Sequence, residues 1–354
     1  MREKRLNEQA ETVRNRWAVA TIRDVARLAG VSTATVSAVI NDTAFVSPPL
    51  RERVLAAVRE LAYTPSQAAR SLKHGKSRLI ALVVSDLANP FFARVVWAAE
   101  AAVAAWGYSL VVYNSDEKPE NERRIMARVK ELSCDGVVVV PVGPVTQRSH
   151  RDFDGKAMPM VLFGRQVEDK RADTVTIDNV AAGRLVTNYL LDLGHRRIGT
   201  ITGPMHLTTG RGRFDGMIQA MQARGLAPAA EHVRSGEFRE EVAYSVAREI
   251  LERPDRPTAL YVANGVMALG VMRVLADLGI ECPRDISIAS TDTISGIGGL
   301  QPRLTRTEHP IVEMTNEALR LLVDRIDRGN DPPPRNVVFQ PSLMLGESCG
   351  PVTA

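Results

Sequence analysis

The sequence predicts a small all-α domain at the N-terminal end, followed by a larger α/β body with two parallel, doubly wound sheets. Apolar residues recur at helical spacing between residues 21 and 64, interrupted by turn residues. From residue 79 onward, short apolar strands alternate with amphipathic helices, which is the pattern of parallel sheets. The 354 residues also exceed one ordinary core and indicate about two or three folding units.

Charge is distributed unevenly between these two regions. The whole chain has a net charge of +4, but residues 1–78 carry 14 Lys or Arg against 7 Asp or Glu. The remaining residues therefore carry a net charge of −3. A basic end suits a polyanionic partner, although charge alone equally suits a solvated terminus.

No segment has the composition of a membrane anchor or an export signal. No apolar run approaches the ~18 residues that a membrane helix needs, and residues 1–20 lack the apolar stretch of a signal peptide. Cys134, Cys282 and Cys349 are far apart and show no CxxC spacing, which indicates reduced thiols. We therefore expect a cytoplasmic protein without a membrane partner, a cofactor or a metal.

Residues 21–41 have the pattern of two short helices joined by a tight turn. Thr21 can cap the first helix, with Asp24 at its third position. Gly30 can end that helix in the left-handed conformation, and Ser32 can cap the second. This is a helix-turn-helix signature, and an ordinary helical hairpin is the alternative.

The second helix carries small residues on the face turned away from the core. Val36, Val39 and Ile40 are expected to face inward. A helix with only small side chains on its outer face can enter a major groove, where its first residues contact base edges and its hydroxyls contact phosphates. A solvated Ser and Thr face is the competing interpretation. The candidate DNA contacts are Thr21, Ser32, Thr33, Ala34, Thr35, Ser37, Ala38 and Asn41.

A third helix is expected after Ser47-Pro48-Pro49, because a cap and prolines begin helices and an apolar stripe of Val54, Leu55, Val58 and Leu61 follows.

The segment after this helix reads Y-x-P-S-x-x-A-R-S-L. Together with DVARLAGVS, ATVS and VIN, these residues resemble the LacI family of bacterial transcription regulators. The resemblance extends from Thr21 to about Gly350. It implies a repressor that binds double-stranded DNA as a homodimer at a palindromic operator and is controlled by a small effector.

Family members usually begin near Thr21, so residues 1–20 are an extension. A disordered arm is the working expectation, with an extra helix or a start codon assigned too early as alternatives. The resemblance divides the remainder into a DNA-binding domain (21–64), a hinge (65–78) and an effector-binding and dimerisation domain (79–354).

The hinge is a short, basic, Ala-rich segment that Pro65 can open and Gly75 can close. An isolated helix shorter than ~12 residues is marginal in water. The family therefore implies a helix that folds when two copies pack on DNA, with Leu72 as an apolar wedge in the minor groove. A solvated linker is the alternative. The other candidate contacts are Ser66, Ala69, Arg70 and Lys73.

In the body, the resemblance implies a periplasmic-binding-protein-like fold whose chain crosses three times between two lobes. Lobe 1 is expected at about 79–178 and 308–337, and lobe 2 at about 179–307 and 338–354. Ligands of parallel sheets bind at the carboxyl ends of the strands, so we expect the effector between the lobes. The predicted strands are 79–84, 108–113, 136–140, 160–163, 198–202, 259–263 and 286–290, and the predicted helices lie near 91–105, 180–192, 213–223, 266–278 and 311–327.

Candidate effector contacts follow these strands. Phe91 or Phe92 would stack on a flat ligand face, and the guanidinium of Arg213 suits paired hydroxyls or a carboxylate. A buried turn and a surface arginine are the alternatives. Asn264 and Asp292 end two strands, where helix capping is a nearly equal alternative. Arg165 and Asp178 complete a set that suits a polyhydroxylated ligand but does not choose among sugars, sugar acids and nucleobases. The resemblance favours an inducing carbon source, a sugar or sugar derivative, over a corepressor.

The chain departs from the family at three places. Ala38 replaces a base-contacting Arg or His, Asn264 is followed by Gly265, and Ser290-Thr291-Asp292-Thr293 replaces G-F-D-D. The change at Ala38 weakens direct readout and shifts specificity to Thr33, Ala34 or DNA shape. The other two changes remove polar or aromatic groups from the cleft, so the effector is expected to differ from those of relatives, or the response to be altered or lost.

Two other classes of function compete with a regulator. A solute-binding protein would share the two-lobed body, but residues 21–72 argue against it. An enzyme is not expected, because 210–216 (GRGRFDG) lacks G-x-G-x-x-G spacing after a strand and the histidines form no nucleophile–base pair.

Overall fold

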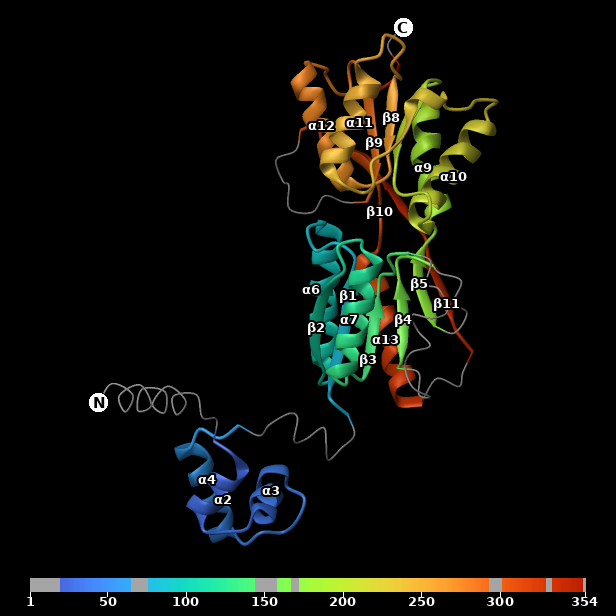
Figure 1. Ribbon diagram of the computed structural model, residues 1–354. Coiled ribbons are helices and arrows are strands. Elements are labelled where there is room, and N and C mark those ends of the chain that lie inside the picture. The colour runs from blue at the N-terminus through green and yellow to red at the C-terminus, as the bar shows by residue number, and fades with distance from the viewer. Residues whose placement is uncertain are drawn as a thin grey trace, which may run out of the picture. The chain divides into compact units, whose positions relative to one another are not determined.

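The computed structural model describes residues 20–64, 76–143, 158–166, 172–292, 301–328 and 333–352. They form two compact units, Met1–Ser77 and Arg78–Ala354 (Figure 1). The expected hinge contacts lie outside the described residues: Ser66, Ala69, Arg70, Leu72 and Lys73.

The N-terminal unit consists of helices α2 (Ile22–Ala29), α3 (Thr33–Asn41) and α4 (Pro48–Glu60) around one small core. The structure confirms the predicted ends of α2. The Asp24 carboxylate accepts a hydrogen bond from the Thr21 amide at 3.0 Å, and Gly30 ends the helix at φ +62°. The Ser32 hydroxyl accepts from the Thr35 amide at 3.1 Å and caps α3.

One core prediction in this unit is wrong. Leu55 is 38% exposed, whereas Ala57 is only 3% exposed and takes the inward position. The reason is the phase of α4. Val54 is fully buried, and the residues three and four positions after it, Ala57 and Val58, lie on the same helix face.

The second unit contains two six-stranded sheets, which confirms the predicted fold class. In the first sheet the strand order is β11-β5-β4-β3-β1-β2, and all pairs are parallel. The first lobe is this sheet with α6, α7 and α13. Its elements are β1 (Leu79–Val84), α6 (Pro90–Ala105), β2 (Ser109–Asn114), α7 (Pro119–Glu131), β3 (Gly136–Val139), β4 (Met160–Phe163), β5 (Asp173–Ile177), α13 (Ile311–Arg328) and β11 (Asn336–Phe339).

In the second sheet the order is β12-β10-β9-β8-β6-β7, and only the pair β10–β12 is antiparallel. The second lobe is this sheet with α9 to α12. Its elements are α9 (Asn179–Asp192), β6 (Ile198–Thr202), α10 (Thr208–Gln222), η1 (Ala230–His232), β7 (Val233–Ser235), α11 (Glu240–Leu251), β8 (Ala259–Val262), α12 (Gly265–Leu278), β9 (Ser287–Thr291), β10 (Thr305–Glu308) and β12 (Ser342–Met344).

The chain passes between the two sheets three times: from β5 to α9, from β10 to α13, and from β11 to β12 (Figure 1). The return of α13 and β11 to the first sheet is fixed by a buried ion-pair cluster. Asp173, at the start of β5, lies 2.7 Å from both Arg325 of α13 and Arg335. Burial alone would raise the pKa of Asp173, but the hydrogen bonds from these two guanidinium groups lower it.

Helices α9 and α10 of the second lobe pack unusually closely because glycines lie at their contact. A Cβ on Gly183 would overlap the carbonyl oxygen of Arg213, and one on Gly216 would overlap the carbonyl oxygen of Val180. Only glycine, which has no Cβ, lets two backbones approach this closely. The glycines of 210–216 therefore serve helix packing, and this packing fixes the start of α10 beside α9.

Candidate functional site

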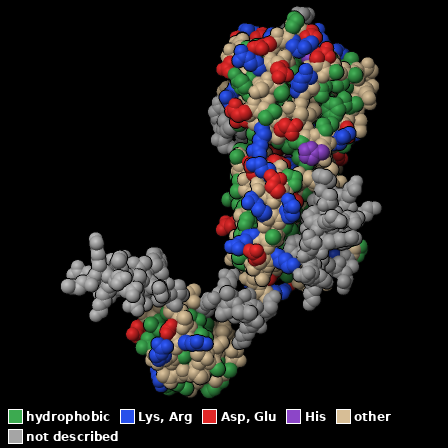
Figure 2. All heavy atoms as spheres, in the orientation of Figure 1, with side chains coloured by type: hydrophobic (Ala, Val, Ile, Leu, Met, Phe, Trp, Pro, Cys, Tyr) green, Lys and Arg blue, Asp and Glu red, His purple; other side chains and the backbone are tan. Residues whose placement is uncertain are grey.

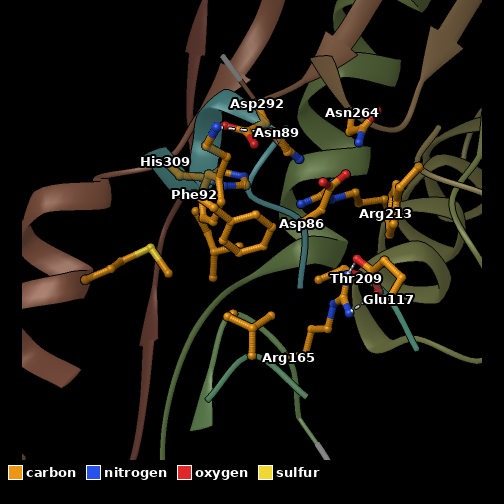
Figure 3. Close-up of a pocket in the computed structure, with 16 residues that line it drawn as sticks. Asp86, Asn89, Phe92, Glu117, Arg165, Thr209, Arg213, Asn264, Asp292 and His309 are labelled. Carbon is orange, nitrogen blue, oxygen red and sulfur yellow. Dashed lines mark hydrogen bonds and ion pairs between the residues drawn. The ribbon is translucent and has the colours of Figure 1, made fainter. Parts of the chain in front are cut away.

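A cavity lies between the two lobes, at the carboxyl ends of both sets of parallel strands, as the fold leads one to expect. It has about 610 Å³ of empty space, counting its open mouth. Side chains from both lobes converge on it (Figure 3). Its lining consists of Asp86, Asn89, Phe91, Phe92, Glu117, Val140, Gly164, Arg165, Ile177, Thr209, Arg213, Phe238, Asn264, Asp292, His309 and Met314.

The first lobe contributes an aromatic wall at the start of α6. The Asn89 side chain accepts from the Phe91 amide at 3.0 Å and so caps this helix. The Phe91 and Phe92 rings meet edge to face with centroids 5.0 Å apart. Both rings line the cavity and both are nearly buried, at 9% and 6% exposed. The two interpretations of these residues, core aromatics and ligand contacts, are therefore compatible.

Arg165, at the end of β4, lines the cavity as one half of an ion pair. Its two terminal nitrogens donate to the two carboxylate oxygens of Glu117, at 2.6 and 2.8 Å. A third bond goes to the carbonyl oxygen of Pro141 at 3.1 Å. Burial is the largest single effect on the pKa of Glu117 and acts to raise it, but the hydrogen bond and charge of Arg165, together with smaller effects such as the Arg239 charge, lower it on balance. The Arg165 charge is thus neutralised within the protein.

Arg213 enters the cavity from α10 of the second lobe. Its Nε donates to the Asn179 side-chain oxygen at 3.0 Å, and one terminal nitrogen donates to the Ala263 carbonyl at 2.6 Å. The guanidinium carbon lies 5.9 Å from the Phe238 ring centre. Burial lowers the pKa of Arg213, while the negative charge of Asp292 acts in the opposite direction. No carboxylate lies within ion-pair distance of Arg213 among the described residues.

Two further sequence candidates line the cavity, and one does not. Asn264 is both a cap and a lining residue, because its side-chain oxygen accepts from the Met267 amide at 2.8 Å. Asp292 lines the cavity directly after β9, with φ +75°. Asp178 instead caps α9 by accepting from the Ala181 amide at 2.8 Å and is not part of the lining.

Several lining residues were not predicted. His309 follows β10 and is 4% exposed, with a buried Nε2 that has no hydrogen-bond partner in the described structure. Its ring meets Phe91 edge to face at 6.0 Å. Burial and then the Arg213 charge hold the pKa of His309 well below its ordinary value. Thr209 also presents a buried hydroxyl without a partner in this part of the chain. No local motif marks either residue.

The N-terminal unit presents the second candidate site on α3. Thr33 and Ala34 are exposed at its start, while Ser37 and Ala38 are half-buried. The Asn41 side chain donates to the Ser37 carbonyl at 2.9 Å. The first turn of α3 thus offers exposed small side chains and backbone amides, which suit base edges and phosphates. Phe45, in the following loop, is 92% exposed and carried no sequence signal.

Lys and Arg side chains are interspersed with Asp and Glu over the visible face of Arg78–Ala354 (Figure 2). In the described part of the chain, no cluster of three or more His, Cys, Asp or Glu side chains could hold a metal. None of the described helices is both long and apolar enough to cross a membrane.

The fold and the two sites define a DNA-binding protein with a separate body built to hold a small ligand. Residues 21–66 match the model of the bacterial regulatory proteins of the lacI family, and residues 187–349 match that of a periplasmic binding protein-like domain. The HTH-type transcriptional repressor PurR of Edwardsiella ictaluri is 34% identical over 310 residues, which cover 87% of this chain and 91% of that protein.

The chain belongs to the lacI family of bacterial regulatory proteins. It is a transcriptional repressor with a helix-turn-helix DNA-binding domain and an effector-binding domain.

Solved structures agree with this assignment over most of the chain. The complex of the transcriptional regulator CelR with cellobiose is 32% identical, has a TM-score of 0.70, and matches over 93% of this chain and 99% of that one. The Lac repressor dimer bound to operator and the anti-inducer ONPF is 26% identical, with a TM-score of 0.80 and the same coverage.

Proposed function

We propose that this protein represses carbon-source utilisation genes as a homodimer on a palindromic operator, and that a neutral sugar or sugar derivative in the inter-lobe cavity releases it. The observation that carries the ligand class is the charge balance of the cavity. Arg165 is neutralised by Glu117, and Asp86 lies 3.6 Å from Arg239. The two other charged lining residues, Arg213 and Asp292, carry opposite signs, so the lining has no excess of either charge for an ionic ligand.

A neutral polyol fits this balance better than an ion does. Each hydroxyl both donates and accepts, so it can satisfy a carboxylate and a guanidinium together. The Phe91, Phe92 and Phe238 rings provide the apolar surface that the carbon face of a sugar needs. The similarity to a regulator solved with cellobiose supports the same class.

On DNA, we propose that α3 enters the major groove, with Thr33 and Ala34 nearest the bases. Leu72 of each subunit would insert into the minor groove at the centre of the operator. Ala38 offers only a methyl group, so specificity is expected to depend on Thr33, Ala34 and DNA shape. The similarity to a Lac repressor dimer on its operator supports a dimer, and a DNA-binding regulator acts in the cytoplasm.

The ligand class is tested by thermal unfolding of the purified full-length protein with cellobiose, ribose, gluconate and adenine. A ligand present at about 100 times its Kd stabilises by about 2.7 kcal/mol, which gives a measurable rise in Tm. We expect stabilisation by a neutral sugar and none by gluconate or adenine. Stabilisation by adenine alone would contradict the sugar class, and no stabilisation by any of them would favour a lost or altered response.

The operator is tested by selection from a random DNA pool at physiological salt, with Leu72→Ala in parallel. The wild-type protein should enrich a palindrome with a central pyrimidine–purine step, and the variant should not. An identical palindrome from the variant would remove Leu72 from the DNA contacts.

A further inference from the structure

Two loops of matching conformation lie at the mouth of the cavity, one in each lobe. Asp116 and Glu117 follow β2 with φ +54° each, and Glu237 and Phe238 follow β7 with φ +53° and +55°. β2 and β7 are the corresponding edge strands of the two sheets. Positive φ is uncommon outside glycine, so two such pairs at equivalent places indicate that their surroundings hold both loops in position.

Arg239, the residue after the second loop, extends from the second lobe to the first. One terminal nitrogen donates to a carboxylate oxygen of Asp116 at 3.1 Å, and the other lies 3.6 Å from a carboxylate oxygen of Asp86. The Asp86 side chain is 14% exposed and lines the cavity. One guanidinium therefore joins two carboxylates of the opposite lobe.

The charges continue from this contact into the cavity wall. Asp116 is adjacent to Glu117, which binds Arg165 through both carboxylate oxygens. Lys118 first, and Arg239 second, lower the pKa of Asp116, so its carboxylate is ionised at neutral pH. A network of alternating charges thus reaches from α11 in the second lobe to the lining of the effector cavity.

We propose that Arg239 clamps the two lobes together in the absence of any ligand. A ligand shifts an equilibrium between open and closed lobes only by its different affinity for the two states. Arg239 contributes to the same equilibrium from within the protein, since its bonds to Asp86 and Asp116 exist only when the lobes are closed. Any effect of this clamp on DNA binding rests on the proposed function, whereas the clamp itself does not depend on it.

A matched control exists in the same lobe. Arg273 of α12 binds Glu240 and Glu241 of α11 at 2.8 and 2.7 Å, entirely within the second lobe. Arg273→Met and Arg239→Met each remove a partly exposed guanidinium with two carboxylate partners. Only Arg239→Met removes a bond between the lobes.

The clamp is tested by hydrogen–deuterium exchange of the full-length protein without ligand. Arg239→Met should speed exchange about fivefold or more, at the low end of typical coupling energies, in residues 86–92 and 115–119 of the first lobe. Arg273→Met should leave both segments unchanged. Equal exchange of these segments in the wild type and Arg239→Met would overturn the proposal, as would an equal effect of both variants on the first lobe.

A second variant and a salt series guard against a local effect of the Arg239 change. Asp116→Asn, on the other lobe, should speed exchange in 236–243 of the second lobe. Raising NaCl from 50 to 500 mM should speed exchange at the cleft in the wild type but have little further effect on Arg239→Met, because salt screens exposed ion pairs. These outcomes involve no sugar, so failure to find a sugar ligand would leave them unaffected.

Discussion

Arg165 and Glu117 form a two-pronged ion pair in the wall of the effector cavity, with terminal nitrogen–oxygen distances of 2.6 and 2.8 Å. The side chains are 7% and 19% exposed, so the pair is largely removed from water. It influences the electrostatics of the site, since an unpaired Arg165 would add a positive charge that favours anionic ligands.

Glu117→Gln should lower the free energy of unfolding by about 3 kcal/mol, because it leaves the Arg165 charge in the wall without its counter-charge. Arg165→Met should have a similar effect, and the double variant should be less destabilised than the two single effects together. Urea unfolding at pH 7 measures all three. As a control, Glu347→Gln, which breaks the exposed pair with Arg303, should change stability little. Strictly additive effects at Glu117 and Arg165 would contradict the pairing.

Acidification should destabilise the protein below about pH 6.5 through His309. Its pKa is held well below 6.5 in the folded protein, by burial first and by Arg213 second. The unfolded chain therefore takes up the proton more readily, so the stability is present above the unfolded pKa and is lost as pH falls below it.

The expected loss through His309 approaches about 1.4 kcal/mol per pH unit. Urea unfolding between pH 7.5 and 5.5 measures it. His309→Gln should show a shallower decline, with the remaining slope assigned in part to His195, whose pKa is also lowered, mainly by burial. Asp173 contributes nothing in this range, because its lowered pKa affects stability only near pH 4 and below. Equal slopes for the variant and the wild type would show that His309 does not titrate in this way.

Gly183→Ala should be severely destabilising, because the new methyl group would overlap the Arg213 carbonyl across the contact of α9 and α10. Overpacking a tight contact typically costs about 3 kcal/mol at the upper end of its range. Gly143→Ala is the control, since the nearest atom to its new methyl group is Cγ of Pro119 at 3.7 Å. Thermal unfolding of both variants measures the difference. Equal Tm values would mean that the two helices can separate without cost.

The elements that the sequence predicted well are those with strong local signals. Gly30, Ser32 and the apolar positions of α2 and α3 act within a few residues, and the apolar runs of β1, β4 and β6 are visible without their partners. Element ends moved slightly, and α10 begins at Thr208, five residues before the predicted 213.

The elements that were missed depend on distant partners. β5 reads DTVTI, and its buried Asp173 is satisfied by Arg325, 152 residues away along the chain. α7 is so rich in charge that its apolar face is narrow, and the short strands β7 and β12 occur at sheet edges. The other missed elements are η1, α11, β10 and β11.

The residues of the candidate site likewise fall into those that the local sequence indicated and those that it did not. Phe91, Arg213 and Asn264 lie beside recognisable strand ends or motifs, so the sequence indicated them. Glu117 and His309 line the cavity only because the chain crosses between lobes and folds into a left-handed loop, which no local pattern reveals.

Arg213→Lys should abolish the response to the effector while preserving DNA binding. The planar guanidinium donates to Asn179 and Ala263 at once, and a lysine ammonium cannot reproduce that fork. We expect at least a tenfold loss of affinity for any sugar that stabilises the wild type, with about 1 kcal/mol lost in stability for a hydrogen bond.

The measurement that isolates this role is operator affinity with and without that sugar, for Arg213→Lys and for Arg211→Lys. Arg211 is an exposed neighbour on α10 whose Nε donates to the Met205 carbonyl at 3.3 Å. The Arg211 variant should respond like the wild type, and the Arg213 variant should bind operator equally with and without sugar. If Arg213→Lys lost operator binding in the absence of sugar as well, Arg213 would be needed for the DNA-binding conformation itself, and its role could not be confined to the ligand.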